Sequence, residues 1–157
     1  MKSVRFAKPR ANEEIPWVRI DDFPKLRLSK ARVLINGAFD LLHAGHRKII
    51  NVAAKHGTVI CALDSDRWVA ERKGPDRPIL TWIERAVSLN YLPIDYIVEI
   101  DNDGDFKRLV EVLEPTLRVQ GAEYSGYTSR CPDIPKLLVH AAGMRTTELI
   151  RRIRGTS

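Results

Sequence analysis

The stretch Ile35-Asn-Gly-Ala-Phe-Asp-Leu-Leu-His-Ala-Gly-His46 decides the fold that we expect for this chain of 157 residues. Val33 and Leu34 lead into it as an apolar run, a glycine turn follows, and two histidines stand three positions apart at its end. This order predicts a strand, a turn and a helix, with His43 and His46 as neighbours on one face of the first helical turn. The start of a helix attracts phosphate because its N–H groups are unpaired and its dipole is positive there. Two imidazoles at such a position suggest a nucleoside triphosphate site.

On both sides of this stretch, short apolar runs alternate with helical patterns. We expect strands at 33–36, 58–63, 95–100, 117–120 and 136–140, and helices at 44–56, 81–92, 105–113 and 146–154. Residues 67–80 are charged and contain Gly and Pro, so we expect a loop there. The alternation predicts an α/β fold, with a single Rossmann-like parallel sheet of about five strands and helices on both faces. Ligands of such sheets bind beyond the carboxyl ends of the strands.

The composition narrows the class of protein. The apolar fraction of 44% and the charged fraction of 29% are those of an ordinary soluble domain. No apolar run approaches the ~20 residues of a membrane span, and the first residues lack the apolar core of a secretory signal. The two cysteines, Cys61 and Cys131, form no C-x-x-C pair and no disulfide framework. We therefore expect a cytoplasmic protein that does not associate with membranes.

The net charge of +6 is concentrated at the N-terminus. Residues 1–30 hold eight Lys/Arg and four Asp/Glu, whereas the other 127 residues hold eighteen and sixteen. We therefore divide the chain into an irregular N-terminal arm, 1–30, with room for one short strand, and a globular domain, 31–157. Because the domain itself is nearly balanced in charge, nucleic acid is not the expected partner. We expect the arm to pack across the domain or onto a second subunit, and a contact with a polyanion or another partner is the alternative.

Gly37 to His46 resembles the G-x-F-D-x-x-H-x-G-H motif of the cytidylyltransferase-like nucleotidyltransferases. The resemblance extends over roughly residues 32–154 and implies transfer of a nucleoside monophosphate from a triphosphate to a phosphorylated acceptor, with release of pyrophosphate. In that family the two histidines contact the triphosphate and stabilise the transition state, so His43 and His46 are expected to be catalytic. The nucleotide-binding residues implied here are Gly37, Ala38, Phe39, Asp40, Gly45 and Lys48.

Three further elements extend the resemblance along the chain. Leu63-Asp-Ser-Asp66 resembles the family's N-S-D or S-T-D element, which implies that Asp64 and Asp66 bind the acceptor. Arg72-Lys-Gly-Pro-Asp-Arg-Pro-Ile79 is similar to the K-G-P-x-R-P loop of the adenylyltransferase domain that makes ADP-heptose. It implies a catalytic role for Lys73 and acceptor binding by Arg77. Glu84-Arg85 resembles the family's E-R element, and Arg85 is expected to orient the acceptor or the triphosphate as a catalytic residue.

Two last elements lie near the C-terminus. Val119-Gln-Gly-Ala-Glu-Tyr124 looks like the family's V-K-G-G-D-Y element and implies nucleotide binding by Gln120, Gly121 and Glu123. Gln120 replaces a lysine of that pattern, so the base is left open. Residues 143–153 resemble the S-T-T-x-L-I-x-x-I element that opens the last helix. Thr146 and Thr147 are thus expected to bind nucleotide phosphates or to cap the helix. The segment 124–136 does not match the family.

These elements predict a nucleotidyltransferase that favours ATP and transfers AMP to a sugar 1-phosphate such as a heptose phosphate. The alternative is a CTP-dependent cytidylyltransferase that acts on glycerol 3-phosphate or a related alcohol phosphate. Leu41 argues against phosphopantetheine and nicotinamide-mononucleotide adenylyltransferases, which usually carry proline there. An alternative of another class is a catalytically silent module that binds nucleotides or nucleic acid. We expect Mg²⁺ as the cofactor with the nucleotide, no metal site built from protein residues, and a homodimer.

Overall fold

The computed structural model describes residues 15–124, 133–140, 143 and 145–155. Five strands form one parallel sheet in the order β3-β2-β1-β4-β5. They are β1 (Arg32–Gly37), β2 (Thr58–Asp64), β3 (Tyr96–Ile100), β4 (Leu117–Gly121) and β5 (Lys136–Val139). The predicted α/β fold with a five-stranded parallel sheet is therefore confirmed, and each strand lies within two residues of its expected bounds.

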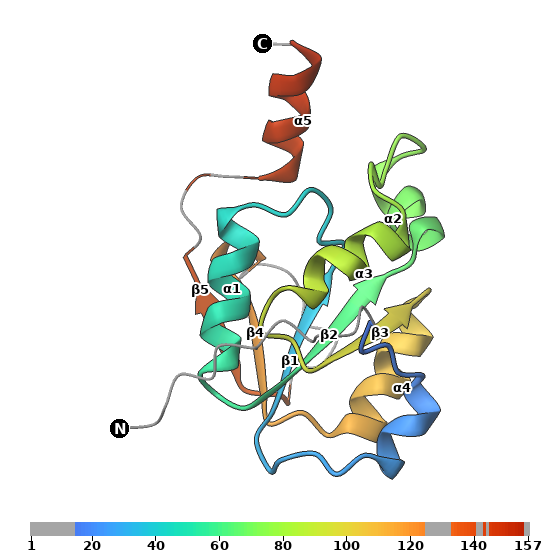
Figure 1. Ribbon diagram of the computed structural model, residues 1–157, viewed down its shortest axis with the longest axis vertical. Helices are drawn as coiled ribbons and strands as arrows, with labels where there is room; N and C mark the ends of the chain where they lie inside the picture. The colour runs from blue at the N-terminus through green and yellow to red at the C-terminus, as the bar shows by residue number, and fades with distance from the viewer. Residues whose placement is uncertain (1–14, 125–132, 141–142, 144, 156–157) are drawn as a thin grey trace.

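Helices cover both faces of the sheet, as predicted (Figure 1). On one face α1 (Ala44–Ala54) and α3 (Trp82–Asn90) pack on a core that includes Val33 and Ile35. On the other face α4 (Asp103–Leu113) and the 3-10 helix η1 (Ile20–Lys25) pack on a core that includes Leu34. Successive residues of a strand point to opposite faces, so β1 contributes to both cores. The last helix, α5 (Thr146–Arg154), projects from the edge of the sheet at which the strands end (Figure 1).

The prediction of a loop at 67–80 is wrong for the first half of this segment, because Asp66–Lys73 form the helix α2. The Ser65 hydroxyl caps this helix by accepting a hydrogen bond from the Trp68 N–H at 3.0 Å. Asp66 lies in the first turn, Arg72 and Lys73 lie in the last turn, and Gly74 follows with φ of 104°. These end signals favour a helix because each side-chain charge opposes the helix dipole at its own end. Residues 74–80 form the connection between α2 and α3.

Residues 15–25 pack across the domain. Trp17 forms an isolated parallel bridge with Ile97 at the outer edge of β3, and the Val18 N–H donates to the Ile97 carbonyl at 2.9 Å. The helix η1, which the sequence did not predict, places Phe23 in the second core with 2% of its surface exposed. Residues 1–14 of the predicted arm lie outside the described residues, and the division of the chain at residue 30 stays a prediction. None of the described helices has the length and apolar character needed to cross a membrane.

The order of the strands locates the site. β1 lies between β2 and β4, so the chain leaves β1 toward one side of the sheet and later returns to its other side at β4. Such a reversal opens a crevice beyond the carboxyl ends of the two strands. The loop from Ala38 to His43 follows β1, and Ala122 and Glu123 follow β4. The fold thus brings the two elements with the predicted nucleotide-binding residues to one edge.

Candidate active site

The two histidines of the motif lie in contact at the start of α1. His43 is the residue before the helix, and its Nδ1 accepts a hydrogen bond from the Gly45 N–H at 3.1 Å. Its ring stacks on that of His46, with the centroids 3.8 Å apart and the planes 24° from parallel. The Phe39 ring lies 5.3 Å from the His46 ring on another side. The expected contact between the histidines is therefore present, and Phe39 belongs to the same cluster.

Burial keeps both imidazoles neutral near pH 7. Burial, followed by the nearby His43 and Lys73, lowers the pKa of His46 to about 3, and Asp40 opposes this only in part. Burial also lowers the pKa of His43, against the opposing effect of Glu123. The Nδ1 atom of His46 is buried and makes no hydrogen bond within the described part of the chain. Buried polar atoms without a partner are rare, and a catalytic role is one recurrent explanation for them.

Basic side chains from the end of α2 and the following connection approach the histidines. Burial and the nearby Arg77 and Arg72 lower the pKa of Lys73. Arg77 lies 3.4 Å from a carboxylate oxygen of Asp40 through its Nε. Lys73 is thus close enough to His46 to lower its pKa, and Arg77 lies beside Lys73 and Asp40. Cations grouped beside an imidazole in this way suit a polyphosphate.

The sequence predicted no role for Arg72, although this residue belongs to the element at residues 72–79. It forms an ion pair with the buried carboxylate of Asp64, and its guanidinium lies 4.8 Å from the centre of the Trp68 ring. Trp68 and Arg72 are four positions apart on α2, which brings them to one side of the helix, and Asp64 lies just before the helix at the end of β2. The contact was missed because this segment was expected to be a loop. Asp64, expected to bind the acceptor, is thus already paired with a cation.

Asp40 joins the loop after β1 to the connection between α2 and α3. Its side chain is 1% exposed and accepts hydrogen bonds from the N–H groups of Ile79 and Leu80 at 2.8 and 3.0 Å. Its neighbours Phe39 and Leu41 have φ of 47° and 50°, a left-handed conformation that residues with a side chain rarely adopt. Such strain persists only where surrounding contacts hold it in place, and it clusters at functional sites. The predicted nucleotide contact of Asp40 stays a prediction.

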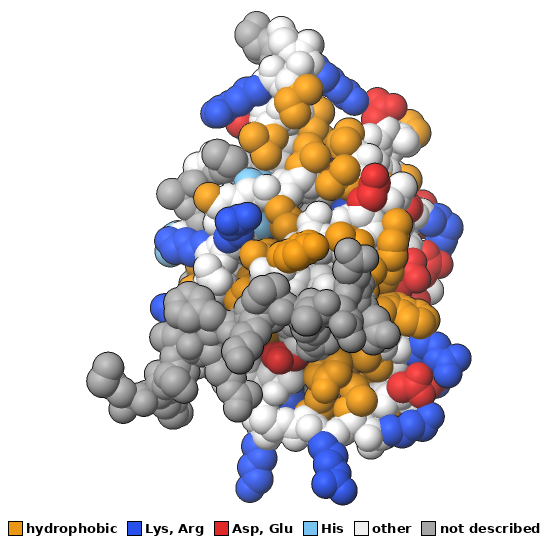
Figure 2. Space-filling view, viewed as in Figure 1, with side chains coloured by type: hydrophobic (Ala, Val, Ile, Leu, Met, Phe, Trp, Pro, Cys, Tyr) orange, Lys and Arg blue, Asp and Glu red, His pale blue; other side chains and the backbone are white. Residues whose placement is uncertain are grey.

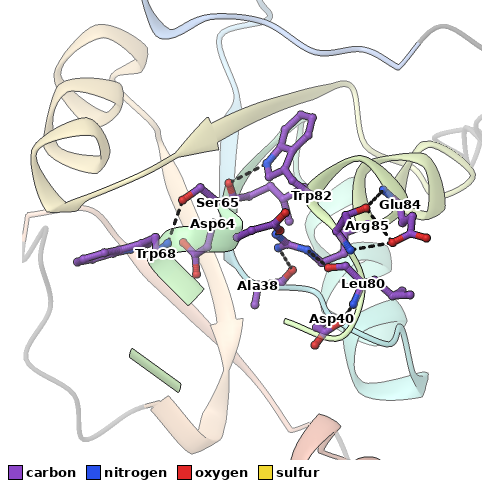
Figure 3. Close-up of polar contacts among 12 residues, drawn as sticks. Ala38, Asp40, Asp64, Ser65, Trp68, Leu80, Trp82, Glu84 and Arg85 are labelled. Carbon is purple, nitrogen blue, oxygen red and sulfur yellow. Dashed lines mark hydrogen bonds and ion pairs between the residues drawn. The ribbon is translucent and has the colours of Figure 1, made fainter. Parts of the chain in front are cut away.

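Arg85 is fully buried and bonds to three segments of the site. Its guanidinium donates to the backbone oxygens of Ala38 and Leu80 at 2.7 and 3.1 Å (Figure 3). It also donates to Oδ1 of Asp66 at 2.6 Å, and the Asp66 side chain is 47% exposed. In this arrangement solvent does not reach Arg85, whereas it does reach Asp66. The expected contact of Arg85 with substrate stays a prediction.

The remaining predicted residues lie at the ends of β1 and β4 and on α1 and α5. Glu123 packs so closely over Gly121 that a Cβ at position 121 would lie 2.3 Å from its carboxylate. Thr146, at the start of α5, donates its hydroxyl to the backbone oxygen of Asp40 at 2.9 Å instead of capping its own helix. The Lys48 ammonium donates to the backbone oxygen of His140 at the end of β5. Gly37 ends β1, Ala38 follows it in the loop, and Gly45 lies in the first turn of α1. Gln120 lies in β4, and Thr147 is exposed on α5.

The structure thus brings the predicted residues to one edge of the sheet, with α5 beside them. Arginine side chains flank α5 and hydrophobic side chains lie between them (Figure 2). The ion pair between Arg154 and Asp76, 3.8 Å long, joins the end of α5 to the connection between α2 and α3. Across the described residues, no group of three or more His, Cys, Asp or Glu side chains is arranged to hold a metal ion. Residues 125–132, in the segment that did not match the motifs, lie outside the described residues.

Comparison with known proteins places this chain near one protein family. The model of the cytidylyltransferase-like family matches residues 34–148. The bifunctional protein HldE of Campylobacter fetus subsp. fetus is 37% identical over 134 residues, which cover 82% of this chain and 29% of that protein. The bifunctional protein HldE of Syntrophotalea carbinolica is 38% identical over 133 residues, which cover 83% of this chain and 26% of that protein. The chain therefore spans less than a third of the length of these relatives.

Solved structures of similar shape support the fold. The lipopolysaccharide core biosynthesis protein from Thermoplasma volcanium aligns with a TM-score of 0.58 over 72% of this chain and 98% of that chain, at 18% identity. Pantothenate synthetase from Thermus thermophilus aligns with a TM-score of 0.59 over 78% of this chain and 60% of that chain, at 11% identity. Identities this low show a shared fold and leave the chemistry to the residues of the site.

Proposed function

Because this chain belongs to the cytidylyltransferase-like family of nucleotidyltransferases, we propose that it transfers AMP from ATP to a sugar 1-phosphate such as a heptose phosphate. The family match makes the chain a nucleotidyltransferase, as the sequence predicted. The observation that carries the proposal is the stacked pair of neutral histidines at the start of α1, next to Lys73. No other described part of the chain combines these groups with the start of a helix.

In the proposed reaction, a phosphate oxygen of the acceptor attacks the α-phosphorus of ATP. A new P–O bond forms, the bond to the bridging oxygen breaks, and pyrophosphate leaves with its electron pair. Negative charge grows on the non-bridging and leaving oxygens, and groups that already point there stabilise it. A neutral imidazole presents one N–H for this purpose and needs no protonation first. His43 and His46 supply such donors, and Lys73 and Arg77 supply positive charge.

The preference for ATP and a sugar phosphate rests on the last residue of α2 and the connection that follows it. Their sequence, Lys73-Gly-Pro-Asp-Arg-Pro78, is similar to the loop of the adenylyltransferase domain that makes ADP-heptose, and the relatives at 37–38% identity carry the name HldE. Gln120, in place of a lysine, leaves the base less constrained. CTP with glycerol 3-phosphate or a related alcohol phosphate is therefore the second candidate. A silent nucleotide-binding module is the third, and it would bind nucleotide without forming pyrophosphate.

The acceptor would lie at the end of β2, beside Asp66. A carboxylate accepts hydrogen bonds, so the exposed Asp66 side chain suits the hydroxyl groups of a sugar or polyol. We propose that magnesium enters with the nucleotide and is held by its phosphates, because ATP is normally bound as its magnesium complex. We also propose a cytoplasmic location, where nucleoside triphosphates are made and used.

A homodimer is the proposed assembly. The helix α3 exposes Ile83 and Val87, by 53% and 42%, and Tyr91 follows the helix with 70% exposed. These residues are four positions apart and so form one apolar line on the helix. Size-exclusion chromatography with light scattering should give twice the monomer mass for the unsubstituted protein. The Val87→Lys variant should give the mass of a single monomer. A monomer in the unsubstituted protein would contradict the assembly.

The test of the reaction is magnesium-dependent release of pyrophosphate. ATP and CTP are each supplied with a panel of sugar 1-phosphates and alcohol phosphates, with wild-type and His46→Ala protein. Release with ATP and a sugar 1-phosphate supports the proposal, and release with CTP and an alcohol phosphate replaces it by the second candidate. Nucleotide binding without pyrophosphate across the panel would favour the silent module.

A further inference from the structure

We infer that Arg85 is a positioning residue that orients Asp66 toward the acceptor and joins the loop after β1 to the connection between α2 and α3. The inference deepens the proposed function and rests on it for its kinetic consequences. The family resemblance alone suggested that Arg85 contacts substrate. The geometry points to a different role, because this side chain has no exposed surface in the structure.

The contacts of Arg85 account for each nitrogen of the guanidinium. Nε donates to the Leu80 oxygen, Nη1 donates to the Ala38 oxygen, and Nη2 donates to the Asp66 carboxylate. A planar guanidinium directs these donors outward in a rigid fork. The three acceptors belong to segments that are far apart in sequence, and each segment carries predicted site residues. One buried side chain therefore sets the relative positions of three parts of the site.

Asp40 makes a second connection between two of the same segments. Its carboxylate accepts from the N–H groups of Ile79 and Leu80, while Arg85 donates to the Leu80 oxygen. Leu80 is thus held at both its N–H and its oxygen (Figure 3). The segment that ends at Leu80 begins with Lys73, so these contacts constrain where the predicted catalytic lysine lies.

Arg85 and Asp66 form an ion pair in which the two side chains differ in solvent exposure. The Arg85 side chain is 0% exposed and that of Asp66 is 47% exposed, so one carboxylate both pairs with a buried cation and faces solvent. Oδ1 is bonded to Arg85, which leaves Oδ2 and the outer face of the carboxylate for a ligand. A carboxylate fixed in this way favours an acceptor that presents a hydroxyl donor, because it offers acceptors alone. Misplacement by even ~1 Å at such a group costs rate or affinity.

The experiment compares Arg85→Lys, Asp66→Ala and the double variant, with Arg108→Lys as control. A lysine keeps the charge and loses the fork. Arg108 pairs with Asp21 on the surface, where both side chains are more than half exposed, and lies outside the proposed machinery. For each protein, kcat and the KM of the acceptor and of ATP are measured from pyrophosphate release. Hydrogen exchange of the Ile79 and Leu80 amides is measured on the same proteins.

We expect Arg85→Lys and Asp66→Ala each to raise the KM of the acceptor by ~10-fold or more, with the KM of ATP changing much less. In the double variant the two increases in KM should not multiply, because both substitutions remove the same interaction between Arg85 and Asp66. Arg85→Lys should also speed exchange at Ile79 and Leu80 by ~10-fold or more, while Arg108→Lys changes neither readout. Multiplying effects, or kinetics of Arg85→Lys within ~2-fold of wild type, would overturn the inference.

Lost turnover with unchanged exchange would also overturn it, because Arg85 would then act on the substrate directly. If Arg85→Lys does not fold, Asp66→Ala alone decides, since its side chain lies at the surface: an unchanged KM of the acceptor removes Asp66 from acceptor binding. Should wild-type protein release no pyrophosphate with any acceptor, the proposed function fails. The exchange measurement still tests whether Arg85 holds the connection in place.

Discussion

Replacing Asp40 by asparagine should destabilise the fold far more than its small chemical change suggests. The two carboxylate oxygens accept from the Ile79 and Leu80 N–H groups at 2.8 and 3.0 Å, and one of them lies 3.4 Å from the Arg77 Nε. An asparagine has one oxygen and one NH₂ group. Whichever way the amide turns, its NH₂ faces at least one backbone N–H, and a buried donor is left without an acceptor.

The expected magnitude follows from burial. The side chain of Asp40 is 1% exposed and that of Arg77 is 11% exposed, so water replaces little of what is lost. Removing one partner of a buried ion pair costs about 3–5 kcal/mol, because the remaining charge stays buried and unpaired. For a domain of this size the melting temperature should fall by about 10 °C, at roughly 2–4 °C per kcal/mol.

The assay is urea unfolding followed by circular dichroism, with Asp21→Asn as the matched control. Asp21 is paired with Arg108 on the surface, where both side chains are more than half exposed, so its loss should cost less than about 1 kcal/mol. The reasoning is refuted if Asp40→Asn lowers the free energy of unfolding by no more than Asp21→Asn does. That outcome would mean that Asp40 does not hold the connection between α2 and α3.

Four further outcomes are expected. His46→Ala should lower turnover by at least ~10² at a similar melting temperature, and near-normal turnover would remove His46 from the mechanism. Lys73→Gln should lower kcat by ~10-fold or more; an unchanged kcat would show that the lysine does not act on the transition state. The pKa of His46 is lowered from 6.5 to about 3, so folded protein binds fewer protons than unfolded protein between these values. The free energy of unfolding should therefore depend on pH through His46. The contribution of His46 should be complete above pH ~6.5, and it should fall by at most about 1.4 kcal/mol per pH unit as the pH drops toward ~3. His46→Gln should remove this dependence on pH. If urea unfolding gives the same pH profile for His46→Gln and for wild-type protein, this prediction is wrong. Leu41→Pro should cost about 3 kcal/mol or more in the same assay, because proline fixes φ near about −65° where Leu41 has 50°. A cost below ~1 kcal/mol would show that the loop adopts another conformation.

Local patterns in the sequence were sufficient for most of the fold. The apolar runs predicted the parallel strands, and the helix expected from residue 81 begins at Trp82, where Thr81 and Glu84 form both hydrogen bonds of a capping box. The motif placed the two histidines at the start of α1, where the spacing of a helix alone brings them together. The helix α2 was missed because the density of charge, Gly and Pro at 67–80 outweighed the cap at Ser65. The helix η1 was missed because its position depends on Phe23 packing against the sheet and α4.

The sequence by itself determined which residue types gather at the carboxyl ends of the strands, because that follows from the order of strands and helices. Their roles depended on the tertiary structure. Asp40 meets Leu80 and Ala38 meets Arg85 across separations of 40 and 47 residues, which no local period describes. The neutral state of His46 likewise follows from its surroundings, since burial and two neighbouring basic groups lower its pKa. A pattern of residues encodes periodicity and chain direction, whereas burial and contact between distant segments exist only once the chain has folded.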